Sequence, residues 1–288
     1  MAQVDNGSSD QQALVESLAY GGDGVARVGG KVAFVPLAAP GDVLRLVARE
    51  RRKSYIRAEI AQIVRGGAAR REPACPLFGR CGGCQWQHVD YEAQLEAKRS
   101  ILKHALRDLP LRVGEFVSAP AELGYRRRVR AHWRVRGGRI ELGFFRAGTQ
   151  RVVDAERCLL CAPELARAWD VLRARLGNVV DGGGTVVLLA GHSGDVHASL
   201  RIDRGRLRGD LDALLCDPLA GIVARDASGS VSRAGRGDLE LDARGVRGSA
   251  DAFAQAGASQ DAALRRHVSA LVPPDCDNLL ELFAGVGN

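Results

Sequence analysis

The chain has 288 residues, of which 46% are hydrophobic, and it carries a formal net charge of +7 with a sequence pI near 9.3. It contains no apolar run of about 18 residues, and the polar start MAQVDNGSSDQQ lacks the features of a signal peptide. These properties argue against a membrane or secreted protein. They predict a cytoplasmic protein, without a membrane partner, whose seven cysteines stay reduced.

The N-terminal quarter of the sequence predicts a small β-barrel. Residues 1–12 are expected to form a disordered tail, and residues 13–66 contain short β-type runs separated by glycine and proline. Evenly spaced short strands are typical of such barrels. The basic positions of this region, Lys53 among them, fit a nucleic-acid-binding side and the charged rim of an ordinary barrel equally well.

A cysteine motif, CPLFGRCGGCQWQH, follows a linker and places Cys75, Cys81 and Cys84 in one short turn. Clustered thiols are soft ligands, so the motif predicts zinc or an iron–sulfur cluster. Three cysteines leave a four-cysteine site one ligand short. Cys158 and Cys161 are both candidates for the fourth position.

A helix is predicted after the cysteine motif, with Asp90 as its N-cap and Leu106 near its end. Its apolar residues recur at helical spacing, and we expect this stripe to be ordinary core. The stripe consists of Tyr91, Leu95, Leu102 and Leu106.

The segment from Arg126 to Arg157 holds ten arginines against three acidic residues, a net charge equal to that of the whole chain. Such clustering favours a polyphosphate partner over a merely solvated basic face. The pattern VRAHWRVR, Gly137-Gly138, RIELGFFR predicts a β-hairpin with arginines on one face. Trp133, Phe144 and Phe145 fit either a base-stacking surface or sheet core, and core is the stronger expectation.

The remaining sequence predicts a helix from Pro163 to Leu176, a hairpin over 185–202 and a helix over 258–271. His192 and His197 are expected to be surface residues. The final segment, NLLELFAGVGN at 278–288, predicts an apolar strand that leads into a G-x-G loop, as at the start of a nucleotide-binding α/β fold.

Taken in order, these motifs resemble the 23S rRNA (uracil-5-)-methyltransferases that carry an N-terminal TRAM domain. The resemblance rests on the cysteine motif with its QWQH ending, GYRRR at 124–128, a cysteine ahead of Ala162-Pro163, FAQ at 253–255 and the terminal ELFAGVGN. It implies a multidomain α+β protein. The expected parts are an OB-like TRAM barrel (13–66), a central, mainly antiparallel iron–sulfur and RNA-binding domain (67–92 and 125–248) and the start of a Rossmann-like methyltransferase domain (93–124 and 249–288).

The resemblance also implies two cofactors and an RNA partner. A [4Fe-4S] cluster is expected on Cys75, Cys81, Cys84 and Cys158, with Cys161 as an unusual neighbour of the fourth ligand. The expected S-adenosylmethionine contacts are Gln255, Phe283, Gly285, Gly287 and Asn288. The expected RNA partner is 23S rRNA rather than another RNA, and the protein is expected to be a monomer. The expected RNA contacts are Arg126, Arg127, Arg128, Arg130 and Lys53.

Two positions depart from the family pattern, namely Gly257 in place of an asparagine and Glu281 in place of an aspartate. The family chemistry uses a cysteine nucleophile and a carboxylate base, both expected beyond Asn288. We therefore assign no catalytic residue, and we expect the 288-residue chain to bind RNA without methylating it.

Other interpretations remain open at this point. They are a non-catalytic RNA-binding module with a structural metal, a uridine-5 methyltransferase acting on tRNA, a zinc knuckle that uses His88, and a radical S-adenosylmethionine enzyme. The C-x5-C spacing argues against the last of these.

Overall fold

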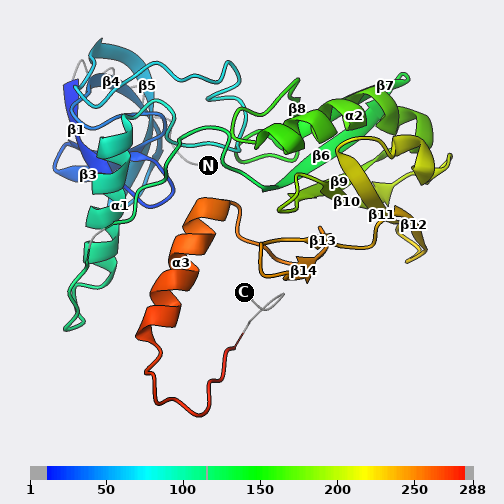
Figure 1. The fold of residues 1–288 in the computed structure, drawn as a ribbon. Helices are drawn as coiled ribbons and strands as arrows, with labels where there is room; N and C mark the ends of the chain where they lie inside the picture. Colours follow the sequence, from blue (N-terminus) through cyan, green and yellow to red (C-terminus); the bar gives the residue numbers. More distant parts are fainter. Residues whose placement is uncertain (1–11, 115, 283–288) are drawn as a thin grey trace. The chain divides into compact units, whose positions relative to one another are not determined.

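The computed structural model describes residues 12–114 and 116–282, and its contacts divide the chain into two compact units, Met1–Ser118 and Ala119–Asn288. Each unit is a mixture of strands and helices (Figure 1). Among the described residues, no helix combines the length and the apolar character needed to cross a membrane.

The first unit begins with the predicted β-barrel, which the structure confirms. Five strands close the barrel in the order β1-β2-β3-β5-β4. The strands are β1 (Gln12–Leu18), β2 (Gly24–Val28), β3 (Lys31–Val35), β4 (Val43–Arg51) and β5 (Tyr55–Arg65). All neighbours are antiparallel except β3 and β5. Of the tail predicted over 1–12, Gln12 already belongs to β1, and the rest lies outside the described residues.

Small side chains fill the barrel interior. Alternation along each strand directs one set of residues inward. Five buried alanines lie among larger aliphatic residues there, and small inward residues suit a tightly closed barrel. The buried cluster consists of Ala13, Val15, Ala26, Ala33, Val35, Ala38, Leu44, Ile56 and Ala58.

Helix α1 (Tyr91–Ala105) follows the cysteine loop, and Asp90 caps it as predicted, with its carboxylate accepting the N–H of Glu92. The prediction of a core stripe is wrong, because no residue of α1 is fully buried and Leu102 is exposed. The helix instead packs through the small residues Ala93 and Ala97 against the cluster of Leu18, Ala39 and Val89.

The division into units differs from the predicted domain boundaries. We grouped 67–92 with the second half of the chain, whereas contacts place this segment with the barrel. A buried carboxylate explains the association, since Asp42 accepts the N–H of Gly67 at 2.9 Å and pairs with Arg70 at 2.6 Å. A Cβ atom at Gly67 would lie 2.3 Å from the carbonyl oxygen of Pro40, so the close approach requires glycine.

The second unit is built on a seven-stranded sheet in the order β12-β11-β10-β9-β6-β7-β8. Its strands are β6 (Arg128–Arg136), β7 (Arg139–Phe145), β8 (Val152–Asp154), β9 (Gly183–Ala190), β10 (Val196–Arg204), β11 (Leu219–Arg225) and β12 (Val231–Gly235). Only β10 and β11 pair in parallel. The predicted hairpins are confirmed, and Gly137 and Gly138, both with positive φ, form the tight β6–β7 turn.

Helix α2 (Pro163–Val179) covers one face of this sheet, as Figure 1 shows. Proline at its first position and Glu164 in its first turn favour the start of a helix there. Its buried stripe faces the strands, and the ring of Trp169 stacks on that of Phe144 at 5.8 Å. The stripe consists of Leu165, Ala168, Trp169, Leu172, Leu176 and Val179.

The opposite face is partly covered by the segment that follows β12. The short strands β13 (Leu239–Glu240) and β14 (Arg247–Gly248) pair with each other. Beside them, Leu241, Ala250 and Ala254 pack on Val187 and Leu189 of β9. This apolar cover therefore lies over the Val187 and Leu189 part of the face.

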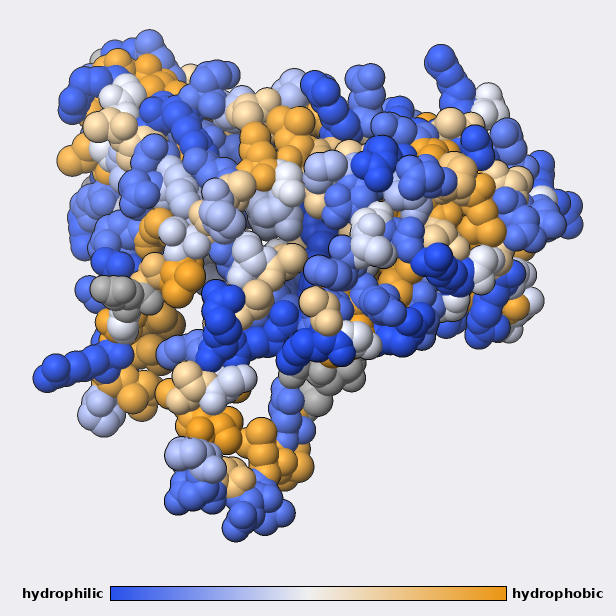
Figure 2. All heavy atoms as spheres, viewed as in Figure 1, coloured by the Kyte–Doolittle hydropathy of each residue, from blue (hydrophilic) through white to orange (hydrophobic). Residues whose placement is uncertain are grey.

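Helix α3 (Ala258–Leu271) has the predicted bounds but leaves apolar residues exposed, as the orange spheres at the bottom of Figure 2 show. Leu264, Val268 and Leu271 are all exposed, and so are Leu279 and the neighbouring leucines of the final segment. Residues 278–282 form no strand, contrary to the predicted apolar strand. Residues 278–282 are exposed, and residues 283–288 lie outside the described part.

Candidate functional site

A buried arginine fastens the loop that contains Gln255. The Arg127 main-chain N–H donates to the carbonyl of Ala256 at 2.7 Å, and its Nε donates to the carbonyl of Gln255 at 3.2 Å. Its Nη1 donates to the carbonyl of Leu241 at 3.0 Å. One side chain at the start of the sheet thus holds the backbone of a loop about 130 residues away along the chain.

The charge of Arg127 is balanced by α3. Its Nη2 donates to Asp261 at 2.9 Å, and both side chains are almost fully buried. Arg265, one helical turn further along α3, reaches the same carboxylate at 3.1 Å and Asp242 at 3.0 Å. Because burying a charge is costly unless it is paired and hydrogen-bonded, this network fixes α3 and the Gln255 loop to the sheet.

The structure describes one of the five predicted cofactor contacts, Gln255. Gln255 is half-buried in the loop fastened by Arg127. The other four predicted contacts, Phe283, Gly285, Gly287 and Asn288, lie outside the described residues. Sequence reasoning missed Asp261, because an acidic residue in the first turn of a polar helix ordinarily indicates only a favourable helix start.

The five predicted RNA contacts differ in how far their side chains are buried. Arg127 is buried and fully engaged, so we correct its role from RNA contact to structural support. Arg126 and Arg128 are half-buried, and burial lowers the pKa of Arg128, with nearby Arg130 adding to the effect. Arg130 and Lys53 are exposed and remain accessible to a ligand.

The aromatic residues of the β6–β7 hairpin point to opposite faces of the sheet. Trp133 is buried and Phe144 stacks on Trp169 under α2, as expected for core. Phe145 lies on the other face, where it stacks on His132 with ring centroids 3.6 Å apart. Sequence reasoning did not single out His132, although the alternation of VRAHWRVR places it in phase with the arginines.

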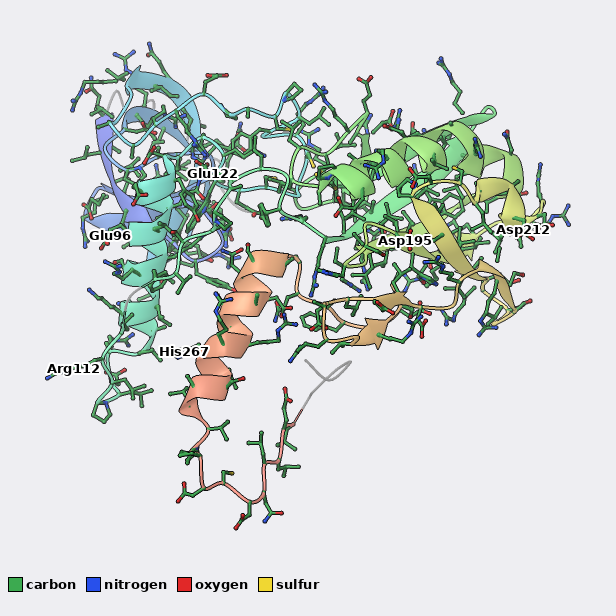
Figure 3. The ribbon with its side chains drawn as sticks, viewed as in Figure 1. Glu96, Arg112, Glu122, Asp195, Asp212 and His267 are labelled. Atoms are coloured by element: carbon green, nitrogen blue, oxygen red, sulfur yellow. The ribbon has the colours of Figure 1, made fainter. Side chains whose placement is uncertain are left out.

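The two predicted surface histidines differ. His192 is exposed as expected, but His197 on β10 is buried, and its Nδ1 accepts the N–H of Ala250 at 3.3 Å. The prediction for His197 is therefore wrong, because the segment after β14 covers this part of the sheet. Asp195, labelled in Figure 3, lies at the start of β10 and pairs with Arg236.

In the cysteine loop, Gln87 connects two of the three predicted ligands. Its Oε1 accepts the N–H of Cys75 at 3.1 Å, and its Nε2 donates to the sulfur of Cys84 at 3.3 Å. The N–H of Gly83 donates to the sulfur of Cys81 at 3.4 Å. Hydrogen bonds to sulfur favour the thiolate form that a metal requires.

Cys158 and Cys161, in the second unit, interact with each other. The hydrogen bond from the Cys161 thiol lowers the pKa of Cys158 to about 6, whereas the same bond and burial raise the pKa of Cys161. Cys158 therefore has the more ligand-like thiolate of the two.

The donor chemistry of these cysteines fits a thiolate-bound group. Across the described ranges, no three His, Cys, Asp or Glu side chains gather into a set that could hold a metal ion. His88 is buried against Phe78, with neither ring nitrogen hydrogen-bonded, and it joins no such set.

Comparison with known proteins identifies the barrel and relates the chain to RNA-modifying enzymes. Residues 8–61 match the TRAM domain model. An uncharacterized RNA methyltransferase of Aquifex aeolicus is 37% identical over 152 residues, which cover 51% of this chain and 34% of the relative. The 23S rRNA (uracil(1939)-C(5))-methyltransferase RlmD of Halomonas elongata is 37% identical over 173 residues, which cover 59% of this chain and 36% of the relative. These alignments span about a third of each relative's length.

A solved structure resembles nearly the whole chain. The tRNA (uracil-54, C5)-methyltransferase of Pyrococcus abyssi, in complex with S-adenosyl-L-homocysteine, matches with a TM-score of 0.69 at 25% identity. The match covers 96% of this chain and 68% of that protein. The barrel, the sequence relatives and this structural neighbour together support the resemblance to TRAM-domain-containing RNA (uracil-C5)-methyltransferases.

Proposed function

We propose that this chain acts in the S-adenosylmethionine-dependent methylation of uracil C5 in 23S rRNA. The observation that carries the proposal is the similarity of 96% of the chain to a uracil-C5 methyltransferase solved with S-adenosyl-L-homocysteine. The relatives that include the Halomonas elongata enzyme favour rRNA as the substrate. A TRAM barrel and the exposed cations Arg130 and Lys53 supply surfaces suited to RNA.

The Gln255 loop is the described part of the proposed cofactor site. Arg127 holds the carbonyls of Gln255 and Ala256, which limits the positions that the Gln255 side chain can reach. We propose that Gln255 contacts S-adenosylmethionine together with Phe283, Gly285, Gly287 and Asn288. When bound, the cofactor supplies the electrophilic methyl group.

The reaction also needs a thiolate that adds to uracil C6 and a base that removes the C5 proton. We assign neither role to a residue of this chain. Its proposed contribution is to bind RNA and to orient one side of the cofactor. We therefore expect the 288-residue chain to bind RNA and to transfer no methyl group.

Two assays on the purified chain test this function. Filter binding should detect a complex with a 23S rRNA fragment, while incorporation of labelled methyl groups from S-adenosylmethionine should stay at background. Methylation of uracil C5 by the chain would contradict the assignment of roles. A complete lack of RNA binding would contradict the proposed function.

The structural neighbour acts on tRNA according to its name, which makes tRNA the second candidate substrate. Competition between a 23S rRNA fragment and a tRNA transcript for the chain decides between the two. Preference for the rRNA fragment supports our assignment, and preference for tRNA replaces it.

We also propose that Cys75, Cys81, Cys84 and Cys158 ligate a [4Fe-4S] cluster with a structural role. The support is the thiol donor set, the hydrogen bonds to Cys81 and Cys84 and the lowered pKa of Cys158. Anaerobically purified protein should contain about four iron and four sulfide per chain. Cys158→Ser should lose them, and the matched control Cys216→Ser should not. Retention of the cluster in C158S but not in Cys161→Ser would move the fourth ligand to Cys161, and stoichiometric zinc would exclude the cluster.

A further inference from the structure

One end of the sheet in the second unit presents an aromatic pair beside arginines on the face opposite α2. Pairing places His132 across from Thr185 of β9 and Gly143 of β7, so these residues share a face. Arg130 and Phe145 lie on this face by alternation, and the His132–Phe145 contact confirms it. The apolar cover formed by Leu241, Ala250 and Ala254 packs on Val187 and Leu189, further along β9.

The two rings stack face to face and form a platform that a base can extend only from the outer face of one ring. Their planes are inclined by only 10°, and both side chains are half-buried. The Thr185 hydroxyl lies 3.4 Å from His132 Nδ1 and helps to fix the imidazole orientation. Burial, followed by the nearby Arg130, lowers the pKa of His132, so the ring is neutral near pH 7 despite the opposing influence of Asp203. A neutral, fixed aromatic surface suits stacking against a base.

Arginine charge next to this platform is not neutralised within the described part of the chain. Arg130 is exposed, lies two residues from His132 and makes no side-chain hydrogen bond or ion pair there. Arg134, two residues beyond His132, also makes none, although Glu141 lies opposite it on β7. Arg201, across β9 from the platform, instead pairs with Asp203 at 2.8 Å. Free guanidinium groups on both sides of a stacking surface match the repeat of base and phosphate in a nucleic acid strand.

The chemistry favours single-stranded RNA over a duplex or a protein. A base can extend the His132–Phe145 stack only when it is not already stacked and paired within a helix. An acidic protein surface would use the arginines but would leave the aromatic platform without a matched partner.

We propose that this face is a single-stranded RNA site, in which an unpaired base stacks on the His132–Phe145 platform while Arg130 and Arg134 bind the flanking phosphates. The site rests on the proposed RNA-binding function and deepens it. It assigns a base contact to the second unit, apart from the TRAM barrel.

The test measures the affinity of the full chain for a single-stranded oligouridylate and for an RNA duplex of equal length. Phe145→Leu, which removes the ring but keeps an apolar side chain, should weaken oligouridylate binding roughly tenfold. Arg130→Gln should weaken oligouridylate binding severalfold. It should also reduce the steepness of the plot of log K against log salt concentration by about 0.7. Duplex binding should respond to Arg130→Gln but much less to Phe145→Leu.

Arg167→Gln is the matched control, because it removes the same charge from exposed α2 on the other face of the sheet. It should leave oligouridylate affinity within about twofold. If Phe145→Leu and Arg130→Gln bind like the control, the site is overturned while RNA binding by the chain stands. If the wild-type chain binds neither RNA, the proposed function fails together with the site.

A second measurement guards against misfolding of the Phe145 variant. Oligouridylate that contains 4-thiouridine should crosslink to peptides of β6 and β7 in the wild-type chain. Crosslinks confined to the barrel would overturn the site whatever the affinities.

Discussion

Each unit contains a buried arginine–aspartate pair, and the two pairs are built differently. In the barrel unit, Asp42 is fully buried and accepts two main-chain N–H groups, from Ala39 and Gly67, besides the fork of Arg70. In the sheet unit, Asp261 accepts from two arginines, Arg127 and Arg265. One carboxylate thus organises a backbone turn, and the other links side chains of separate elements.

This difference shows what each pair holds in place. Asp42 joins the barrel to the segment that leads into the cysteine loop, and its removal leaves main-chain donors buried without an acceptor. Asp261 belongs to a network in which Arg127 keeps two carbonyl acceptors and Arg265 keeps Asp242. We therefore expect the loss of Asp42 to lower the free energy of unfolding more than the loss of Asp261 does.

The largest expected effect is that of Asp42→Ala. It leaves two N–H groups without their acceptor and leaves Arg70 with only the carbonyl of Leu37, so the free energy of unfolding of the barrel unit should fall by about 3–5 kcal/mol. Urea denaturation measures the loss. A loss below about 1 kcal/mol would show that water or another group replaces the carboxylate.

Asp261→Asn should have a smaller effect, about 1.5–3 kcal/mol, because the arginines that lose the charge keep other acceptors. The same denaturation series measures it. Hydrogen exchange of the Gln255 loop should also accelerate, since the substitution removes the ion pair between Arg127 and Asp261 of α3. Unchanged exchange in that loop would argue against the supporting role of Arg127.

Acid should weaken the Asp42–Arg70 ion pair by protonating the carboxylate. Burial on its own raises the pKa of Asp42, but Arg70 and the N–H groups of Gly67 and Ala39 outweigh burial and lower the pKa below 3.8. The carboxylate therefore stabilises the folded state at neutral pH, and this contribution is lost as the pH falls below about 4 through the folded-state pKa. The stability difference between wild type and Asp42→Asn should shrink over that window, whereas a constant difference would contradict the linkage.

The smallest effect is expected for the exposed pair on the barrel wall. Arg49 and Glu59 lie 2.7 Å apart, with both side chains more than half exposed. Solvent and salt screen such pairs, so Glu59→Gln should lower stability far less than Asp261→Asn does, and less still in 1 M salt. A cost comparable to that of Asp42→Ala would show that burial is not what separates these pairs.

The sequence by itself determined the elements and their order. Alternation, glycine turns and the Asp90 cap predicted the barrel, the hairpins and the helices, because these signals act between residues close in the chain. The cysteine motif, the GYRRR segment and the terminal ELFAGVGN suggested the family that the comparisons support.

Only the tertiary structure decided which residue of each motif does what. The three consecutive arginines look alike in the sequence, yet Arg127 is buried against Asp261, while Arg130, two residues beyond the run, is exposed beside His132 and Phe145. The helical stripe of α1 suggested core that is not buried, and His197 is buried by a segment about 50 residues further along the chain. Burial and ion pairing depend on contacts between segments far apart in the chain, and no local pattern records which segments meet.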